Sequence, residues 1–190
     1  MRAIVIAGTL LLGGLGVFAQ RMGPVTPEWT AVLPVVRETV GKEFPMPESP
    51  NPVKISTTAD VTGDGTPEAL IDLGCCGAYT DDMTVMRMED GKPVLALFRG
   101  KDGKVSTMLF SDGASVMHGA AVQMIRTEHA VFSAVWNMKV DGTKMHDCGG
   151  KALKWDTATK VFTFDQGLSA KLSREFCKER GAALSKQGRH

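Results

Sequence analysis

Apolar residues recur with two different periods along this chain, and the change of period divides it into parts. Between Trp29 and Val40 they follow helical spacing, which predicts a helical arm, and Pro34 within it predicts a kink or a split. From residue 53 the period becomes two, because apolar and polar side chains alternate through residues 53–61 and again through 69–73. This alternation is typical of half-buried strands, so the sequence predicts a β domain after the arm.

Five Asp-Gly dipeptides punctuate the following part of the chain and separate further strand-like segments. Asp-Gly between apolar runs favours a hairpin, because both residues accept a positive φ at low cost. Leu168, Leu172 and Phe176 then repeat every four residues, which predicts a C-terminal helix. We therefore expect a mainly β fold, an antiparallel meander of about eight or nine strands with a helical arm before it and a helix after it. The additional predicted strands are residues 83–88, 93–98, 105–110, 115–125, 130–140, 151–155 and 160–164.

The strands fall into two similar units, residues 53–98 and 116–164, each of which resembles a four-stranded blade. The first unit has an acidic loop after its first strand, and residues 126–129 stand at the corresponding place in the second. Two blades cannot close a propeller, which needs about four or more. We expect the two units to pack on each other or to form one larger sheet, with the helices covering an edge.

The N-terminus has the parts of a secretory signal. Arg2 precedes an apolar run, and the small-residue exit at Val17-Phe18-Ala19 suits signal peptidase. The run is short for a membrane span, so we expect a secreted or periplasmic protein, with a retained membrane anchor as the alternative. No membrane span is expected once the signal has been removed.

A proline-rich segment, with four prolines between Pro45 and Pro52, predicts an extended linker between the arm and the β domain. Without the leader, basic and acidic residues are equal in number, so nucleic acid is a poor expectation for a partner. The predicted organisation is a signal peptide (1–19), a helical arm with its linker (20–52), a disulfide-linked β domain with the C-terminal helix (53–184) and a flexible tail (185–190).

The four cysteines of the chain are Cys75, Cys76, Cys148 and Cys177. An even number in an exported chain favours disulfides, and no pair has the spacing of a zinc site. A bond between the neighbours Cys75 and Cys76 would close a strained ring. We expect one of them to pair with Cys148 and the other with Cys177, with buried free thiols as the alternative.

The acidic loop between the first two predicted strands is the most specific chemical pattern in the chain. Alternate positions of a tight loop direct their oxygens inward, and calcium requires about six to eight hard oxygen ligands. Strand parity places the first and last acids opposite Val61 and Ala69, outside the expected core. The alternative is a metal-free turn in which the side chains cap backbone N–H groups. The candidate calcium ligands are Asp60, Thr62, Asp64, Glu68 and the carbonyl of Thr66.

Asp-x-Thr-Gly-Asp-Gly-x-x-Glu followed by Ala-Leu-Ile resembles the FG-GAP and VCBS repeats of integrin-type β-propellers. The resemblance covers at most residues 53–98. It implies that Asp60, Asp64 and Glu68 are carboxylate ligands, that Thr62 is a hydroxyl ligand and that Thr66 is a carbonyl ligand of calcium. The chain departs from the family pattern in having Thr62 in place of an acid or amide and in having a single such loop.

No set of catalytic residues is identified. Within His146-Asp147-Cys148 we expect a disulfide role for the thiol, and Asp72, Asp81 and Asp82 are interpreted as solvated acids. Of the aromatic residues Tyr79, Trp136 and Trp155, which suit a recognition face, Trp136 is expected in the core. We predict a non-catalytic exported binding module with calcium as a structural ion and a protein or a glycan as its partner. The alternatives are an exported hydrolase with an acidic site assembled in three dimensions and a periplasmic enzyme inhibitor, which would present a loop near residues 75–82.

Overall fold

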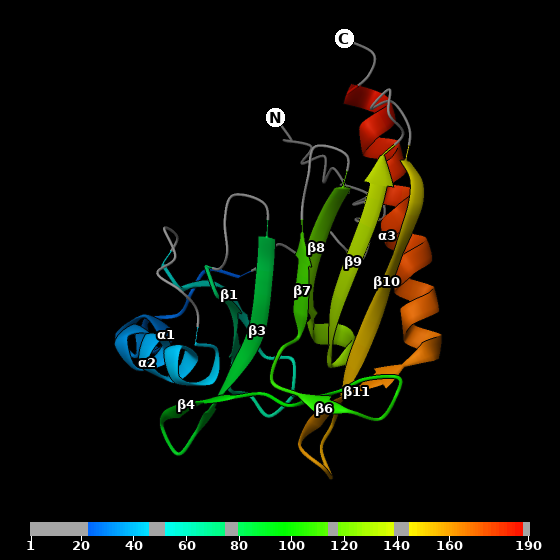
Figure 1. Cartoon of the computed structure of the whole chain (residues 1–190). Coiled ribbons are helices and arrows are strands. Elements are labelled where there is room, and N and C mark those ends of the chain that lie inside the picture. The colour runs from blue at the N-terminus through cyan, green and yellow to red at the C-terminus, as the bar shows by residue number, and fades with distance from the viewer. Residues whose placement is uncertain (1–22, 46–51, 75–79, 114–117, 139–144, 188–190) are drawn as a thin grey trace, which may run out of the picture.

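Two β-sheets packed face to face, with helices on both outer faces, make up this protein, as the computed structural model shows (Figure 1). It describes residues 23–45, 52–74, 80–113, 118–138 and 145–187. The mainly β class, the N-terminal helical arm and the C-terminal helix predicted from the sequence are confirmed. Within the described residues no helix combines the length and the apolar character needed to cross a membrane.

The first sheet contains most of the first predicted unit. Its order is β1-β2-β3-β4, all antiparallel, and β7 also pairs with the beginning of β3. β2 lies in the interior of this sheet, and four of its five residues are buried. The strands are β1 (Lys54–Ala59), β2 (Glu68–Asp72), β3 (Thr80–Glu89), β4 (Lys92–Leu95) and β7 (Phe110–Gly113).

The second sheet contains the second predicted unit and two short strands from the connection. Its order is β6-β5-β11-β10-β9-β8. β5 pairs with β11 in parallel, so the prediction of a purely antiparallel meander is wrong at this one pair. The strands are β5 (Phe98–Arg99), β6 (Val105–Ser106), β8 (His118–Ile125), β9 (Ala130–Met138), β10 (Met145–Asp156) and β11 (Val161–Asp165).

The two units pack on each other, which is one of the two arrangements expected from the sequence. The core between them joins side chains of both sheets, including Leu70 and Val85 from the first and Val131 and Phe162 from the second. The helices cover the outer faces of the sheets and not an edge, so that part of the expectation is wrong. Each sheet is therefore buried on both faces, which is why β2 and the first half of β9 are apolar or buried at nearly every position.

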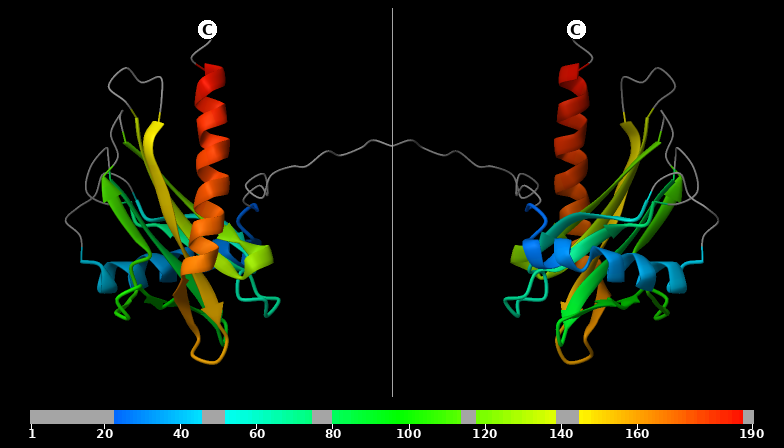
Figure 2. Two further views of the ribbon diagram at one scale, coloured as in Figure 1. Left: turned by 90° about the vertical axis from the view of Figure 1, so that its right-hand side faces the viewer. Right: turned by 90° about the vertical axis from the view of Figure 1, so that its left-hand side faces the viewer.

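The outer face of the first sheet is covered by α1 (Pro27–Ala31) and α2 (Leu33–Glu43). The predicted arm helix is split at Val32, just before Pro34, because proline belongs in the first turn of a helix and not in its interior. Trp29 and Val36 are buried against this face. The right-hand view of Figure 2 shows both helices in front of the first sheet.

The outer face of the second sheet is covered by α3 (Gln166–Gln187), seen in front in the left-hand view of Figure 2. Its predicted apolar stripe of Leu168, Leu172 and Phe176 is buried against β9 and β10. Two hydroxyl groups fasten the helix to β10. Ser169 Oγ accepts a hydrogen bond from Ala152 N at 2.8 Å, and Ser173 Oγ donates to the carbonyl of Gly150 at 3.1 Å.

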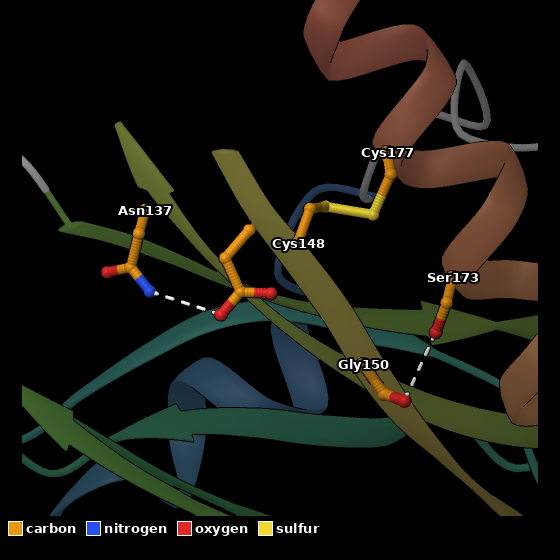
Figure 3. Close-up of a disulfide and its surroundings, with 6 residues drawn as sticks. Asn137, Cys148, Gly150, Ser173 and Cys177 are labelled. Carbon is orange, nitrogen blue, oxygen red and sulfur yellow. Dashed lines mark hydrogen bonds between the residues drawn. A yellow bond between two sulfur atoms is a disulfide. The ribbon is translucent and has the colours of Figure 1, made fainter. Parts of the chain in front are cut away.

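A disulfide joins Cys148 on β10 to Cys177 on α3 (Figure 3), with a Cα–Cα distance of 5.9 Å. The expected pairing of each of these two with Cys75 or Cys76 is therefore wrong, and Cys75 and Cys76 themselves lie outside the described residues. The sequence placed Cys148 in a loop, whereas β10 begins at Met145 and carries the cysteine on the face that α3 covers. The predicted strand began only at residue 151, so the sequence did not place Cys148 on the strand that α3 covers.

Candidate functional site

The acidic loop connects β1 to β2, and its first acid organises the turn. Asp60 Oδ1 accepts a hydrogen bond from Gly63 N at 2.7 Å, and Asp60 Oδ2 accepts one from Gly65 N at 3.1 Å. Both glycines have a positive φ, 80° and 89°, which a residue with a side chain adopts only with strain. One carboxylate thus satisfies two backbone donors of a turn that needs glycine at two positions.

Asp64 makes a smaller turn within the same loop. Its Oδ1 accepts a hydrogen bond from Thr66 N at 2.8 Å, and both residues are exposed. This is the local side chain to backbone bond that Asp commonly forms two residues ahead of itself. Asp60 therefore caps the backbone as expected of the metal-free turn, and Asp64 does so as well, whereas Thr62, also expected to cap the backbone, donates its hydroxyl to Glu68.

Glu68 does not lie outside the core as strand parity predicted. Its side chain is only 1% exposed, and Oε2 accepts hydrogen bonds from Val61 N at 2.8 Å and Thr62 N at 3.1 Å. Thr62 Oγ1 donates to Oε1 at 3.0 Å. Glu68 does lie on the face opposite Ala69. Val61, which parity placed on the same face as Ala69, is instead buried between the sheets, and β1 is irregular between Ile55 and Thr57. The face opposite Ala69, however, is the one that packs on the second sheet.

Burial raises the pKa of the Glu68 carboxyl from its ordinary value of 4.5, and the nearby Asp64 raises it further, while the bonds from Val61 and Thr62 oppose this shift. A carboxylate is costly to bury unless its oxygens are hydrogen-bonded, and here three donors surround it. Glu68 therefore acts as an internal clamp that holds the beginning of the loop to β2.

The fit of calcium to this loop depends on which oxygens remain open. Glu68 is bonded to the loop backbone, and Thr62 is buried with its hydroxyl directed at Glu68. The two remaining carboxylates belong to Asp60 and Asp64. Among the described residues, no three His, Cys, Asp or Glu side chains are grouped so as to hold a metal ion. The predicted set of five ligands is thus divided between the loop surface and the interior, and calcium binding stays a prediction.

The turn between β8 and β9 lies directly against this loop. It consists of the short 3-10 helix η2 (Arg126–Glu128) and His129, which has a left-handed backbone with φ of 50°. The imidazole of His129 covers Gly63 so closely that a Cβ on Gly63 would lie 2.5 Å from His129 Cε1. The contact requires glycine at position 63 for its lack of a side chain as well as for its φ.

A cleft of about 540 Å³ opens beside the two turns. Three segments far apart in the sequence form its walls: the start of the arm, the end of β1 with the acidic loop, and the end of β8. Asp60 lies on one wall and Arg126 on another. The remaining lining residues are Gly23, Pro24, Thr26, Thr57, Thr58, Ala59, Gly65, Pro67 and Met124.

The arm closes the cleft through hydrogen bonds to the first sheet. Gly23 forms an isolated antiparallel bridge with Thr58, and Thr57 Oγ1 donates to the carbonyl of Gly23 at 2.8 Å. Trp29 Nε1 donates to the carbonyl of Pro67 at 2.7 Å, which ties the arm to the loop itself. The sequence predicted a helical arm but not that the start of this arm forms a wall of a cleft. The sequence contained one indication of this site. Residues 126–129 occupy the place in the second unit that the acidic loop occupies in the first.

The other candidate residues do not gather at this cleft. Cys148 is bound in the disulfide, and Asp147 accepts a hydrogen bond from Asn137 at 3.4 Å, so His146-Asp147-Cys148 offers no nucleophile. Asp72 forms an ion pair with Lys54 at 3.0 Å. Asp82, interpreted from the sequence as a solvated acid, is buried on β3.

The three aromatic residues considered for a recognition face differ in their positions in the structure. Trp136 is buried between Phe176 and Arg180, which confirms its assignment to the core. Trp155 is half-buried beneath the guanidinium of Arg87, whose Cζ lies 4.5 Å from the ring centroid. Tyr79 and most of the loop predicted for an inhibitor lie outside the described residues, as does the side chain of Asp81.

Comparison with known proteins found no matching family model, no matching curated protein and no matching solved structure. The cleft and the two turns beside it are thus the basis for a functional assignment.

Proposed function

We propose that this protein is an exported, non-catalytic binding module that takes its partner, a protein segment or a glycan, in the cleft beside the acidic loop. The observation that carries the proposal is the cleft itself, built from three distant segments and bearing Asp60 and Arg126 on its walls. Its volume of about 540 Å³ is within the range of ligand-binding sites in proteins.

The walls of this cleft are held in place by bonds within the chain. The arm is fixed by the hydrogen bonds of Thr57 and Trp29, and the loop by those of Asp60 and Glu68. A site whose groups are ordered beforehand loses less conformational entropy when a ligand binds, and so gains affinity. The many side chain to backbone bonds around the cleft therefore favour a binding role.

Export is part of the proposal and rests on the leader and on the disulfide. A disulfide such as Cys148–Cys177 is typical of proteins in oxidising compartments. The leader ending at Ala19 supplies the route. Mass spectrometry of the exported protein should find an N-terminus at Gln20.

Calcium is a further, separable part of the proposal. Asp60 and Asp64 would hold the ion, and Glu68 would brace the loop from inside without contacting it. Water would complete the oxygen shell, which places the affinity in the weak range of extracellular calcium modules, about 10⁻⁴–10⁻³ M. The ion would stiffen the loop that forms one wall of the cleft.

The test fills the cleft and leaves the fold unchanged. Pro24 is exposed on the cleft wall and contributes its carbonyl to Thr58, a bond that Pro24→Trp retains. Pro52→Trp is the matched control, because Pro52 is exposed and lies outside the cleft lining. Immobilised wild-type protein and the Pro52 variant should retain the same partner from an extracellular or periplasmic extract, and the Pro24 variant should lose it. Retention by both variants, or loss by both, would contradict a binding role for the cleft.

A further inference from the structure

Arg126 lines the cleft and has no carboxylate partner among the described residues. It is exposed, it lies in the η2 turn, and it makes no ion pair in the part of the chain that the structure describes. The acid of the same turn, Glu128, is occupied by Lys171 of α3 at 2.6 Å. Arginine binds a carboxylate through two parallel N–H bonds, so its natural ligand here is an anion that enters the cleft.

Asp60, which lines the same cleft, restricts which anion that is. Its two oxygens each accept one backbone N–H, and a carboxylate has about four acceptor positions, so each oxygen can accept one more donor. A ligand with two negative charges, such as a phosphate monoester, is repelled by this carboxylate. A ligand with one carboxylate and an N–H donor satisfies both walls.

The cleft lining combines apolar residues with hydroxyl groups. Pro24, Pro67 and Met124 are its larger apolar residues, beside three threonines, and β1 is the edge strand of its sheet. Among the described residues, the outer edge of β1 is paired only by the Gly23–Thr58 bridge. The arm covers this edge at Thr57 and Thr58 through hydrogen bonds to Gly23 and Pro24, so the cleft leaves room for the end of a chain against its apolar residues and not for an added strand.

We propose that the cleft binds the free C-terminal end of a peptide, with Arg126 holding the terminal carboxylate and Asp60 accepting an N–H of the peptide. This assignment rests on the proposed binding role of the cleft and names its ligand class. The last side chain of the peptide is apolar and lies against Met124 and the two prolines. The site takes a peptide terminus, not an internal segment.

The experiment compares the tripeptide Ala-Ala-Leu with its C-terminal amide by calorimetry on the purified protein. The amide lacks the charge that Arg126 recognises but keeps the shape and the other N–H groups. The acid should bind at least about tenfold more tightly than the amide, since a charge-assisted bidentate pair is lost. Arg126→Gln should remove this preference, whereas Arg174→Gln, a change at an exposed arginine of α3 outside the cleft lining, should leave it intact.

The outcomes separate this proposal from the one on which it rests. Equal affinity for acid and amide, an unchanged preference in the Arg126 variant, or no binding of either peptide would overturn the peptide-terminus assignment. The partner-retention test with Pro24→Trp and Pro52→Trp would still support a binding role for the cleft in any of these cases. If the cleft did not bind a partner at all, both proline variants would instead retain the partner equally.

Discussion

The two halves of this sandwich are built alike but are fastened in different ways. In each half a sheet carries a helical cover on its outer face. The second cover, α3, is joined to its sheet by the Cys148–Cys177 disulfide, whereas the first cover is held, in the described part, by hydrogen bonds such as Trp29 to Pro67. The half with non-covalent fastening is also the half in which the start of the arm, just before α1, forms a wall of the cleft.

The two turns that lie against each other beside the cleft differ in a similar way. The acidic loop directs its carboxylates at its own backbone, so Asp60 and Glu68 are ordered by bonds within the loop. The η2 turn directs its charges outward, with Glu128 to α3 and Arg126 to the cleft. One turn therefore holds a fixed acceptor, whereas the other carries an arginine with no ion pair among the described residues, and the proposed peptide site uses both.

Removing the disulfide tests the covalent half. Replacing both Cys148 and Cys177 with Ser should lower the free energy of unfolding by about 3.5 kcal/mol, because the bond closes a long loop in the unfolded chain. Urea denaturation measures the loss. Reductant should destabilise the wild type by a similar amount and leave the double variant unchanged. Peptide binding should survive in the variant, since α3 takes no part in the cleft lining.

Removing the internal clamp tests the other half. Glu68→Ala should cost about 3 kcal/mol, because the N–H groups of Val61 and Thr62 would lose a buried acceptor. Asp64→Ala is the matched control, since Asp64 is exposed and accepts one bond, and its cost should be below about 1 kcal/mol. Chemical denaturation compares the two. Equal losses would show that the buried carboxylate does not hold the loop.

Gly63→Ala tests the contact between the two turns. It should cost about 2 kcal/mol, from a strained positive φ and from the clash with His129. Gly65→Ala has a similar φ and no atom within 4 Å of the new Cβ, so it should show the backbone part alone. Replacing His129 with Gly should recover the difference between the two variants. A double-mutant cycle with no coupling would contradict the close packing of the turns.

Adding calcium tests whether the acidic loop binds a metal ion. At concentrations well above a weak dissociation constant, the ion should stabilise the wild type by about 1 kcal/mol and a chelator should remove the gain. Thermal melting measures it, and Asp64→Ala should respond to neither. The absence of any response at millimolar calcium would leave the loop as a turn held only by its own hydrogen bonds.

Glu68 should contribute to the pH dependence of the free energy of unfolding. Because burial raises the pKa of this carboxyl above 4.5, its contribution to stability is greatest below that pH and is lost as the pH rises through the raised pKa. Relative to Glu68→Gln, the wild type should therefore lose stability as the pH increases in this range.

Asp156→Asn is the control, because stability relative to this variant should change with pH in the opposite direction. The hydrogen bond from Thr159, with that from Ala158, lowers the pKa of Asp156 from 3.8, so its contribution is lost as the pH falls. Denaturation curves collected across acidic pH test both signs. If the stability difference between the wild type and each variant changed with pH in the same direction for both, burial of Glu68 would not explain its pH dependence.

The sequence alone determined the class of the fold and much of its local structure. Period-two alternation identified β1 and β2, Pro34 predicted the division of the arm, and the spacing of Leu168 to Phe176 identified the buried stripe of α3. These features depend on short-range periodicity and on backbone chemistry, which neighbouring residues carry by themselves. The acids of the loop were recognised for the same reason.

Tertiary structure decided which of these features meet. Parity placed Glu68 correctly relative to Ala69, but the packing of a second sheet turned that face into core. The pairing of Cys148 with Cys177 and the meeting of Asp60 with Arg126 at one cleft depend on how distant segments are brought together. Local pattern shows which face of a strand is apolar, but the packing of the whole chain decides which element covers each face, and here that packing formed the cleft.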